Sequence, residues 1–187
     1  MDGFTREFTD TESGLVWTAG TMLERYLQDH EADSFVGKTV LELGSGLGRL
    51  GVILDRMGAN VICTEQPSSV ENLRRCVQGT KIEVRPLLWG EMSYLETLPP
   101  IDIIVGSEII YDADFHDHLI KTLVELFSRN PMAVYYNSFA DRPFSCMFFA
   151  KASDAGLEIS EVNSDYDRLG LEPDRVAIHK LRLKNRT

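Results

Sequence analysis

The sequence lacks any long hydrophobic run. Spanning a bilayer takes roughly 18 consecutive apolar residues, and no stretch of this 187-residue chain approaches that length. The first 14 residues, MDGFTREFTDTESG, are polar and acidic, unlike the apolar centre of a signal peptide or the arginine-rich pattern of a transit peptide. We therefore expect neither a membrane segment nor a targeting leader.

Cysteine is scarce as well. The chain has three cysteines, Cys63, Cys76 and Cys146, and their spacing does not match a metal site. We interpret them as free thiols in a reducing compartment. The cytoplasm is therefore the expected location, with access to the nucleus left open.

The spacing of the His, Cys, Ser and Asp residues also does not indicate a metal site or a nucleophilic triad. His116 and His118 lie two residues apart at the start of an expected helix, and side chains with that spacing face apart on a helix. No Ser-His-Asp or Cys-His arrangement follows from the spacing of the other residues. We expect no bound metal.

Basic charge is in short supply: 19 Lys and Arg stand against 29 Asp and Glu, for a formal net charge of −10. Such a protein repels phosphate backbones unless basic residues gather locally. The one basic cluster, residues 179–186 (HKLRLKNR), alternates with apolar residues, as in a strand with one solvated face. Nucleic acid is disfavoured as a partner, and a cationic ligand or a basic protein segment is favoured.

What the chain does have is an ordinary globular composition, 43% hydrophobic and 26% charged. Its length suffices to bury a core without disulfides. We predict a single domain over residues 1–187, with residues 1–14 as a loose arm, and a monomer.

Strand and helix patterns alternate along the chain. Strands separated by helices predict βαβ units and a mostly parallel sheet, and two final strands without a helix between them predict one antiparallel member. The fold class is therefore α/β, a doubly wound, Rossmann-like sheet of seven strands. Strands are expected at 39–43, 60–64, 82–88, 101–106, 132–139, 157–162 and 176–183, and helices at 16–30, 47–57, 68–78, 114–129 and 142–155.

A glycine-rich turn follows the first expected strand, in residues 39–48 (TVLELGSGLG). Glycines there let the backbone turn tightly and approach a ligand at the start of the next helix. Residues 46–51 (GLGRLG) also match the dinucleotide pattern G-x-G-x-x-G. A dinucleotide pattern should begin directly at the end of the strand, however. The first glycine after this strand is Gly44, and counting from the strand gives the register E-x-G-x-G-x-G. This register favours S-adenosylmethionine over a dinucleotide such as NAD.

Glu65 ends the second expected strand. A carboxylate at this place can accept hydrogen bonds from both hydroxyls of a ribose, and it can lie beside a positively charged sulfonium without cost in charge. Glu65 is therefore a candidate contact for either nucleoside cofactor.

Glu108 and Tyr111 follow the strongly apolar strand 101–106. Ligands of open α/β sheets bind at the carboxyl ends of the strands, which makes this pair a candidate substrate site. The alternative interpretation is structural: a glutamate that caps a helix or forms a salt bridge, followed by a packed tyrosine.

Four motifs together resemble one family. Residues 14–20 (GLVWTAG), the glycine loop, residues 88–90 (LWG) and residues 106–111 (GSEIIY) occur in this order. From about Gly14 to Leu126 the chain resembles the seven-β-strand protein-lysine methyltransferases of the DxxY type, the methyltransferase 16 family. The resemblance implies a class I fold, S-adenosylmethionine as cofactor and a protein substrate.

The resemblance also implies a role for particular residues. Trp17 is expected to cover part of the cofactor, Trp89 to lie beside the adenine, and Glu65 to bind the ribose. Glu42 is expected to support the ammonium of the methionine moiety. The positions assigned to the cofactor are Trp17, Glu42, Gly44, Ser45, Gly46, Glu65, Trp89 and Ser107.

The DxxY motif is here Glu108-Ile109-Ile110-Tyr111, so the carboxylate has a longer arm than the family's aspartate. By resemblance, Glu108 binds the ammonium of the target lysine and orients its lone pair after deprotonation, and Tyr111 forms one wall of the slot. Two alternatives stay open. The protein could methylate a small amine or another protein nucleophile, or it could be a non-catalytic module that binds a protein partner.

Overall fold

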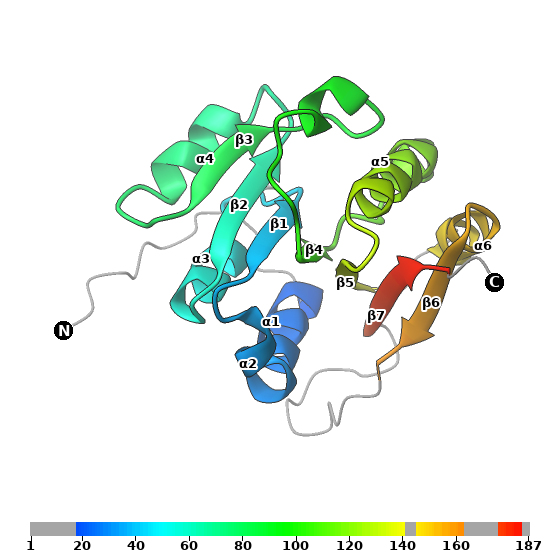
Figure 1. Ribbon diagram of the computed structural model, residues 1–187, viewed down its shortest axis with the longest axis horizontal. Helices are drawn as coiled ribbons and strands as arrows, with labels where there is room; N and C mark the ends of the chain where they lie inside the picture. Colours follow the sequence, from blue (N-terminus) through cyan, green and yellow to red (C-terminus); the bar gives the residue numbers. More distant parts are fainter. Residues whose placement is uncertain (1–17, 141–144, 163–175, 185–187) are drawn as a thin grey trace.

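A seven-stranded sheet forms the centre of the computed structural model, which describes residues 18–140, 145–162 and 176–184. The strand order is β3-β2-β1-β4-β5-β7-β6 (Figure 1). All neighbours pair in parallel except at β7, which runs antiparallel to both β5 and β6. The predicted fold class is confirmed. The strands are β1 (Thr39–Leu43), β2 (Asn60–Glu65), β3 (Glu83–Pro86), β4 (Ile103–Ser107), β5 (Val134–Ala140), β6 (Leu157–Glu161) and β7 (Val176–Leu183).

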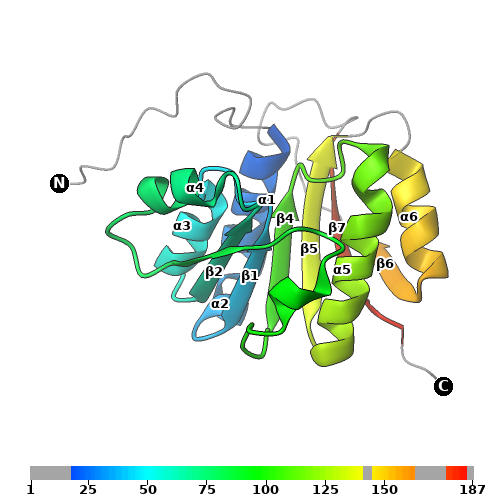
Figure 2. The ribbon, with the colours of Figure 1, turned by 90° about the horizontal axis from the view of Figure 1, so that it is seen from above.

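Helices cover both faces of the sheet (Figures 1 and 2). Helices α1 to α4 pack on one face, and α5 and α6 on the other. Within the described ranges, no helix is long and apolar enough to cross a membrane. The helices are α1 (Thr18–His30), α2 (Ala32–Phe35), α3 (Arg49–Arg56), α4 (Val70–Cys76), α5 (His116–Arg129) and α6 (Ser145–Asp154), with 3-10 turns η2 (Met92–Leu95) and η3 (Ala113–Phe115).

The central strands β1 and β4 are buried on both faces, which explains their nearly unbroken apolar sequences. Alternate residues face opposite layers. Leu41 and Ile104 belong to the core beneath α5 and α6, whereas Val40 and Val105 belong to the core beneath α1 to α4.

Several elements are shorter than predicted. The helix expected at 47–57 begins at Arg49 because Gly48 has a left-handed backbone, with φ of 79°. The strand expected at 82–88 covers only Glu83–Pro86, and the helix expected at 68–78 covers Val70–Cys76. The first residues of the helices expected at 16–30 and 142–155 lie outside the described residues.

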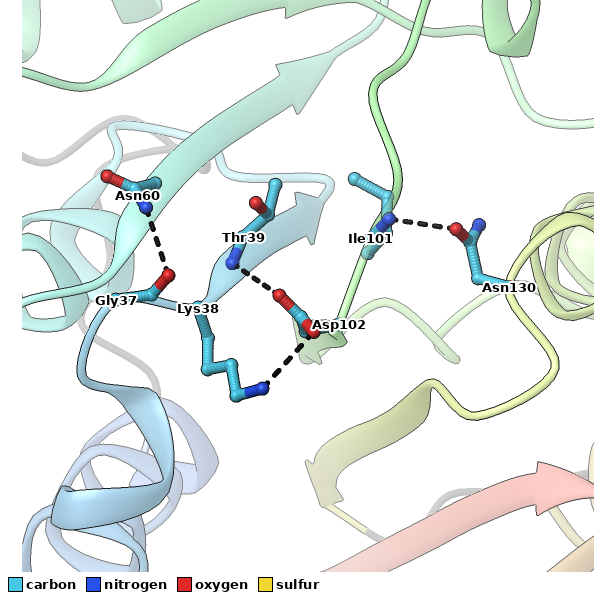
Figure 3. Close-up of polar contacts among 7 residues, drawn as sticks. All are labelled: Gly37, Lys38, Thr39, Asn60, Ile101, Asp102 and Asn130. Carbon is cyan, nitrogen blue, oxygen red and sulfur yellow. Dashed lines mark hydrogen bonds and ion pairs between the residues drawn. The ribbon is translucent and has the colours of Figure 1, made fainter.

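At the amino-terminal edge of the sheet, hydrogen bonds connect the segments that lead into the strands (Figure 3). Asp102, just before β4, accepts the Thr39 amide at 2.9 Å and pairs with Lys38 at 3.4 Å. Asn130, after α5, accepts the Ile101 amide at 2.8 Å. These bonds fix the strands at this edge, and the residues singled out from the sequence lie at the opposite, carboxyl edge.

Candidate active site

The glycine loop connects β1 to α3 at the carboxyl edge. Gly44, Gly46 and Gly48 have φ angles of 63°, 55° and 79°, a conformation that glycine adopts without steric cost. A Cβ atom at Gly44 would lie 2.9 Å from Ile109 Cγ2 and 3.3 Å from Trp89 Cζ2. Three of the four motifs therefore meet around Gly44.

Helix α5 holds the turn that carries Trp89. The Gly90 amide donates to Thr122 Oγ1 at 2.8 Å, and Lys121 Nζ donates to the Gly90 carbonyl at 2.8 Å. A side chain at Gly90 would collide with His118. The half-buried Trp89 is thus fixed beside the glycine loop. Sequence analysis missed these contacts. A possible signal was Thr122, a polar residue among the apolar residues of the α5 sequence, which the structure shows to be fully buried.

Glu65 lies at the mouth of the glycine loop. Its two carboxylate oxygens accept the amides of Gly46 and Gln66, each at 2.9 Å. A carboxylate oxygen can accept more than one hydrogen bond, so a ribose hydroxyl could share these oxygens. The geometry is compatible with the predicted role of Glu65.

Glu42 and Ser45 lie behind the loop rather than at its mouth. Cys63 Sγ donates to Glu42 Oε2 at 3.1 Å, and Ser45 Oγ accepts the Thr64 amide at 3.1 Å. Burial raises the pKa of Glu42 to about 7, although the hydrogen bond from Cys63 partly opposes this. Both side chains support the loop from within, and their direct contact with a cofactor stays a prediction.

Glu108 has an unusual backbone. Its φ of 56° makes it the single non-glycine residue with positive φ among the described residues, a conformation that costs about 1–2 kcal/mol. Its amide donates to the Ser138 carbonyl at 2.8 Å, and its Oε1 accepts the Ala140 amide at 2.9 Å. Two bonds to β5 therefore hold the carboxylate at the end of β4.

Tyr111 is 57% exposed, so it is not the packed tyrosine of the structural alternative. The cap of the following turn is Asp112, whose Oδ1 accepts the Asp114 amide at 3.0 Å. Tyr111 is thus neither a helix cap nor a core side chain, whereas Glu108 is buried and bonded to β5. Strained backbone of the kind seen at Glu108 is typical of functional sites, so its role in the site stays a prediction.

Ser107, at the end of β4, accepts a hydrogen bond from Ser138 Oγ at 3.2 Å. Helix α1 adjoins it, because a Cβ atom at Gly20 would lie 3.2 Å from Ser107 Oγ. One turn further along α1, Glu24 binds the guanidinium of Arg49 through both oxygens, at 2.8 Å each. Sequence analysis missed this pair. Trp17 lies outside the described residues.

The described part of the chain contains no group of three His, Cys, Asp or Glu residues that could hold a metal ion. The candidate site consists of a glycine loop with the carboxylate of Glu65 and the ring of Trp89 beside it, and of a second carboxylate, Glu108, at the neighbouring strand end.

Solved structures with a similar fold include a protein named as a methyltransferase. The chain superposes on the TehB-like SAM-dependent methyltransferase from Corynebacterium glutamicum with a TM-score of 0.64 and 17% identity, covering 87% of each chain. The PH0226 protein from Pyrococcus horikoshii gives a TM-score of 0.66 at 12% identity, covering 88% of this chain and 89% of that one. At these identities the likeness defines the fold alone, a Rossmann-like α/β sheet of seven strands.

Residues 4–155 match the family model described as Lysine methyltransferase, and the chain belongs to this family. Family membership confirms the resemblance seen in the sequence and indicates S-adenosylmethionine as the cofactor.

Curated relatives carry two kinds of name. Histone-arginine methyltransferase METTL23 of Xenopus laevis is 34% identical over 134 residues, which cover 68% of this chain and 57% of that protein. Protein N-lysine methyltransferase METTL21A of Danio rerio is 33% identical over 123 residues, which cover 62% of this chain and 56% of that protein. The chain thus spans a little over half the length of these two relatives.

Proposed function

We propose that this protein transfers the methyl group of S-adenosylmethionine to the side-chain nitrogen of a lysine in a protein substrate. The observation that carries the proposal is Glu108, a strained, nearly buried carboxylate at the carboxyl end of β4. The next residue, Ile109, packs on the glycine loop, and the exposed Tyr111 follows three residues after Glu108.

The residues around the glycine loop fit a nucleoside sulfonium cofactor. Gly44 has no room for a side chain between Ile109 and Trp89, so these two side chains pack directly against the backbone of the glycine loop. Gly44 and Gly46 would hold the methionine moiety, Glu65 the ribose and Trp89 the adenine. Bound S-adenosylmethionine supplies a methyl group on a positively charged sulfur.

Glu108 has the role of a positioning group. A lysine arrives as an ammonium and must lose a proton to solvent before its nitrogen can attack the methyl carbon. A carboxylate that binds the ammonium also stabilises its charged form, so Glu108 orients the amine rather than acting as a strong base. Fixing the reacting atoms in line supplies most of what this reaction needs from the protein. Tyr111 contributes an aromatic face that attracts a cationic nitrogen by about 0.5–2 kcal/mol.

Lysine is favoured over arginine because the family to which the chain belongs is described as Lysine methyltransferase, and because relatives of 33% and 32% identity are named protein N-lysine methyltransferases. Arginine is the second candidate, because relatives at 34% and 31% identity are named histone-arginine methyltransferases.

A basic segment of a protein is the favoured substrate, given the net charge of −10. The same composition supports a cytoplasmic, monomeric protein that does not bind nucleic acid. A small amine as substrate, and a binding module without catalysis, are the alternatives that the experiment must separate.

The test is transfer of a labelled methyl group from S-adenosylmethionine to purified histones and to a cell lysate. After acid hydrolysis, label in methyl-lysine supports the proposal and label in methyl-arginine supports the second candidate. Label in small molecules alone would indicate a small-amine substrate. Cofactor binding without any transfer would indicate a binding module.

The matched variants are Glu108→Gln and Glu91→Gln. Glu108→Gln keeps the shape of the side chain and removes its charge, so it should lose most transfer and retain the fold. Glu91 is exposed and its side chain makes no capping bond, so Glu91→Gln should behave as the wild type. Full transfer by Glu108→Gln would exclude the positioning role.

A further inference from the structure

An ion pair joins helix α1 to the first residue after the glycine loop. Arg49 begins α3 directly after Gly48, and its Nε and one terminal nitrogen donate to the two oxygens of Glu24, each at 2.8 Å. Glu24 is only 5% exposed. Bidentate pairs of this kind have a defined orientation, which single-point ion pairs lack.

Each partner would be unfavourable alone. Arginine in the first turn of a helix places positive charge at the positive end of the helix dipole. Glu24 lies among buried residues of α1, beside Leu23, and burial raises the pKa of its carboxyl despite the opposing effect of Arg49. Together the two charges compensate each other, and the carboxylate of Glu24 lies at the end of α3 where negative charge is favoured.

The pair also has a particular place relative to the candidate site. Gly20 and Glu24 are one turn apart and share a face of α1. Gly20 packs against Ser107 at the end of β4, and Glu24 holds Arg49 at the end of the glycine loop. Helix α1 therefore connects the two strand ends that border the predicted cofactor site.

We propose that Glu24 and Arg49 are positioning residues that fix the glycine loop for cofactor binding. The inference rests on the proposed function, since it concerns the same cofactor site. Neither residue touches the reacting atoms. Their effect is to hold the loop amides in place before the cofactor arrives, which lowers the cost of ordering the loop on binding.

The test compares stability with affinity for S-adenosylhomocysteine, measured by calorimetry. The double variant Glu24→Gln/Arg49→Met removes both charges, so it leaves no unpaired buried charge and should fold. We expect its dissociation constant for S-adenosylhomocysteine to rise about tenfold, which equals about 1.4 kcal/mol. In Arg49→Lys, which keeps the charge but not the two parallel bonds, the constant should rise by a smaller factor.

The control is a second ion pair at the other end of α1. Lys180 of β7 pairs with Glu31 at 3.3 Å, with side chains 24% and 18% exposed. Lys180→Met should lower the melting temperature without changing the affinity. A purely structural role for Arg49 and Glu24 would give the same pattern in their double variant.

The outcomes separate the two proposals. If the wild-type protein does not bind S-adenosylhomocysteine, the proposed function fails and this inference fails with it. If the wild type binds and the double variant binds equally well, only the inference is overturned. If circular dichroism shows that the double variant is unfolded, Arg49→Lys decides: unchanged affinity in that variant overturns the inference.

Discussion

Glu42→Gln should change how the stability of the protein depends on pH. Glu42 is buried behind the glycine loop, and desolvation raises its pKa from an ordinary 4.5 to about 7. A carboxyl whose pKa is higher in the folded state binds its proton more tightly there. The folded protein is therefore stabilised by protonated Glu42 at low pH, and this stabilisation is lost as pH rises from about 4.5 to about 7.

The size of the effect follows from the same two values. A tenfold change in proton affinity equals about 1.4 kcal/mol, so the rise from 4.5 to about 7 corresponds to a loss of about 3 kcal/mol. Glutamine does not ionise and lacks this loss. Its amide hydrogens need partners in the buried site, which costs about 1–3 kcal/mol at every pH. The difference between variant and wild type should thus shift by about 3 kcal/mol in favour of the variant between pH 4.5 and pH 8.

The assay is urea unfolding of both proteins at several pH values, with Glu91→Gln as a control on an exposed glutamate. In a protein of this size, a change of about 3 kcal/mol corresponds to a shift in melting temperature of roughly 6–12 °C, which scanning calorimetry would resolve. Parallel pH profiles for wild type and Glu42→Gln would refute the reasoning, because they would mean that folding does not raise the pKa of Glu42.

Four further predictions concern the mouth of the site. Trp89→Ala should cost more binding free energy for S-adenosylhomocysteine, measured by calorimetry, than free energy of unfolding. A stability loss of about 3–5 kcal/mol with intact affinity would indicate that Trp89 is a core residue only. In a Trp17→Phe background Trp89 is the one remaining tryptophan, so its fluorescence should change on binding. Tyr111→Phe should retain more methyl transfer than Tyr111→Ala if the ring forms a wall of the slot, and equal losses would implicate the hydroxyl. Gly44→Ala should lower the free energy of unfolding by at least about 1–2 kcal/mol, because its φ is positive and Ile109 occupies the space of the new methyl group; wild-type stability in urea would contradict this.

The fold was largely predictable because its main signal is local. Buried parallel strands need continuous β-branched and apolar sequence, and such runs at 39–43, 60–64 and 101–106 mark the centre of the observed sheet. Helix α2 and the turn η2 were missed. Each spans four residues, which is too short for a helical period to show.

The site was predictable only in part. The motif residues could be identified because each motif is contiguous in the sequence, as with the loop glycines and the strand-end carboxylates. The groups that hold them come from elsewhere in the chain. The hydrogen-bonded residues are far apart in the sequence: Arg49 and Glu24 by 25 positions, Gly90 and Thr122 by 32, and Glu108 and Ala140 by 32. No local pattern encodes these pairs, because they depend on the order of the strands.

The glutamate in place of the family's aspartate at position 108 has a physical explanation in these long-range contacts. The amide and the carboxylate of Glu108 both bond to β5, at Ser138 and at Ala140, two residues apart on the same strand. An aspartate has one methylene less, so from the same backbone its carboxylate would fall short of the Ala140 amide. The bond to Ala140 in turn offsets part of the cost of a left-handed glutamate. The longer side chain of Glu108 is therefore not less well ordered than the family's aspartate, because β5 holds its carboxylate through the Ala140 amide. The position of this carboxylate depends on the neighbouring strand as much as on the motif that contains it.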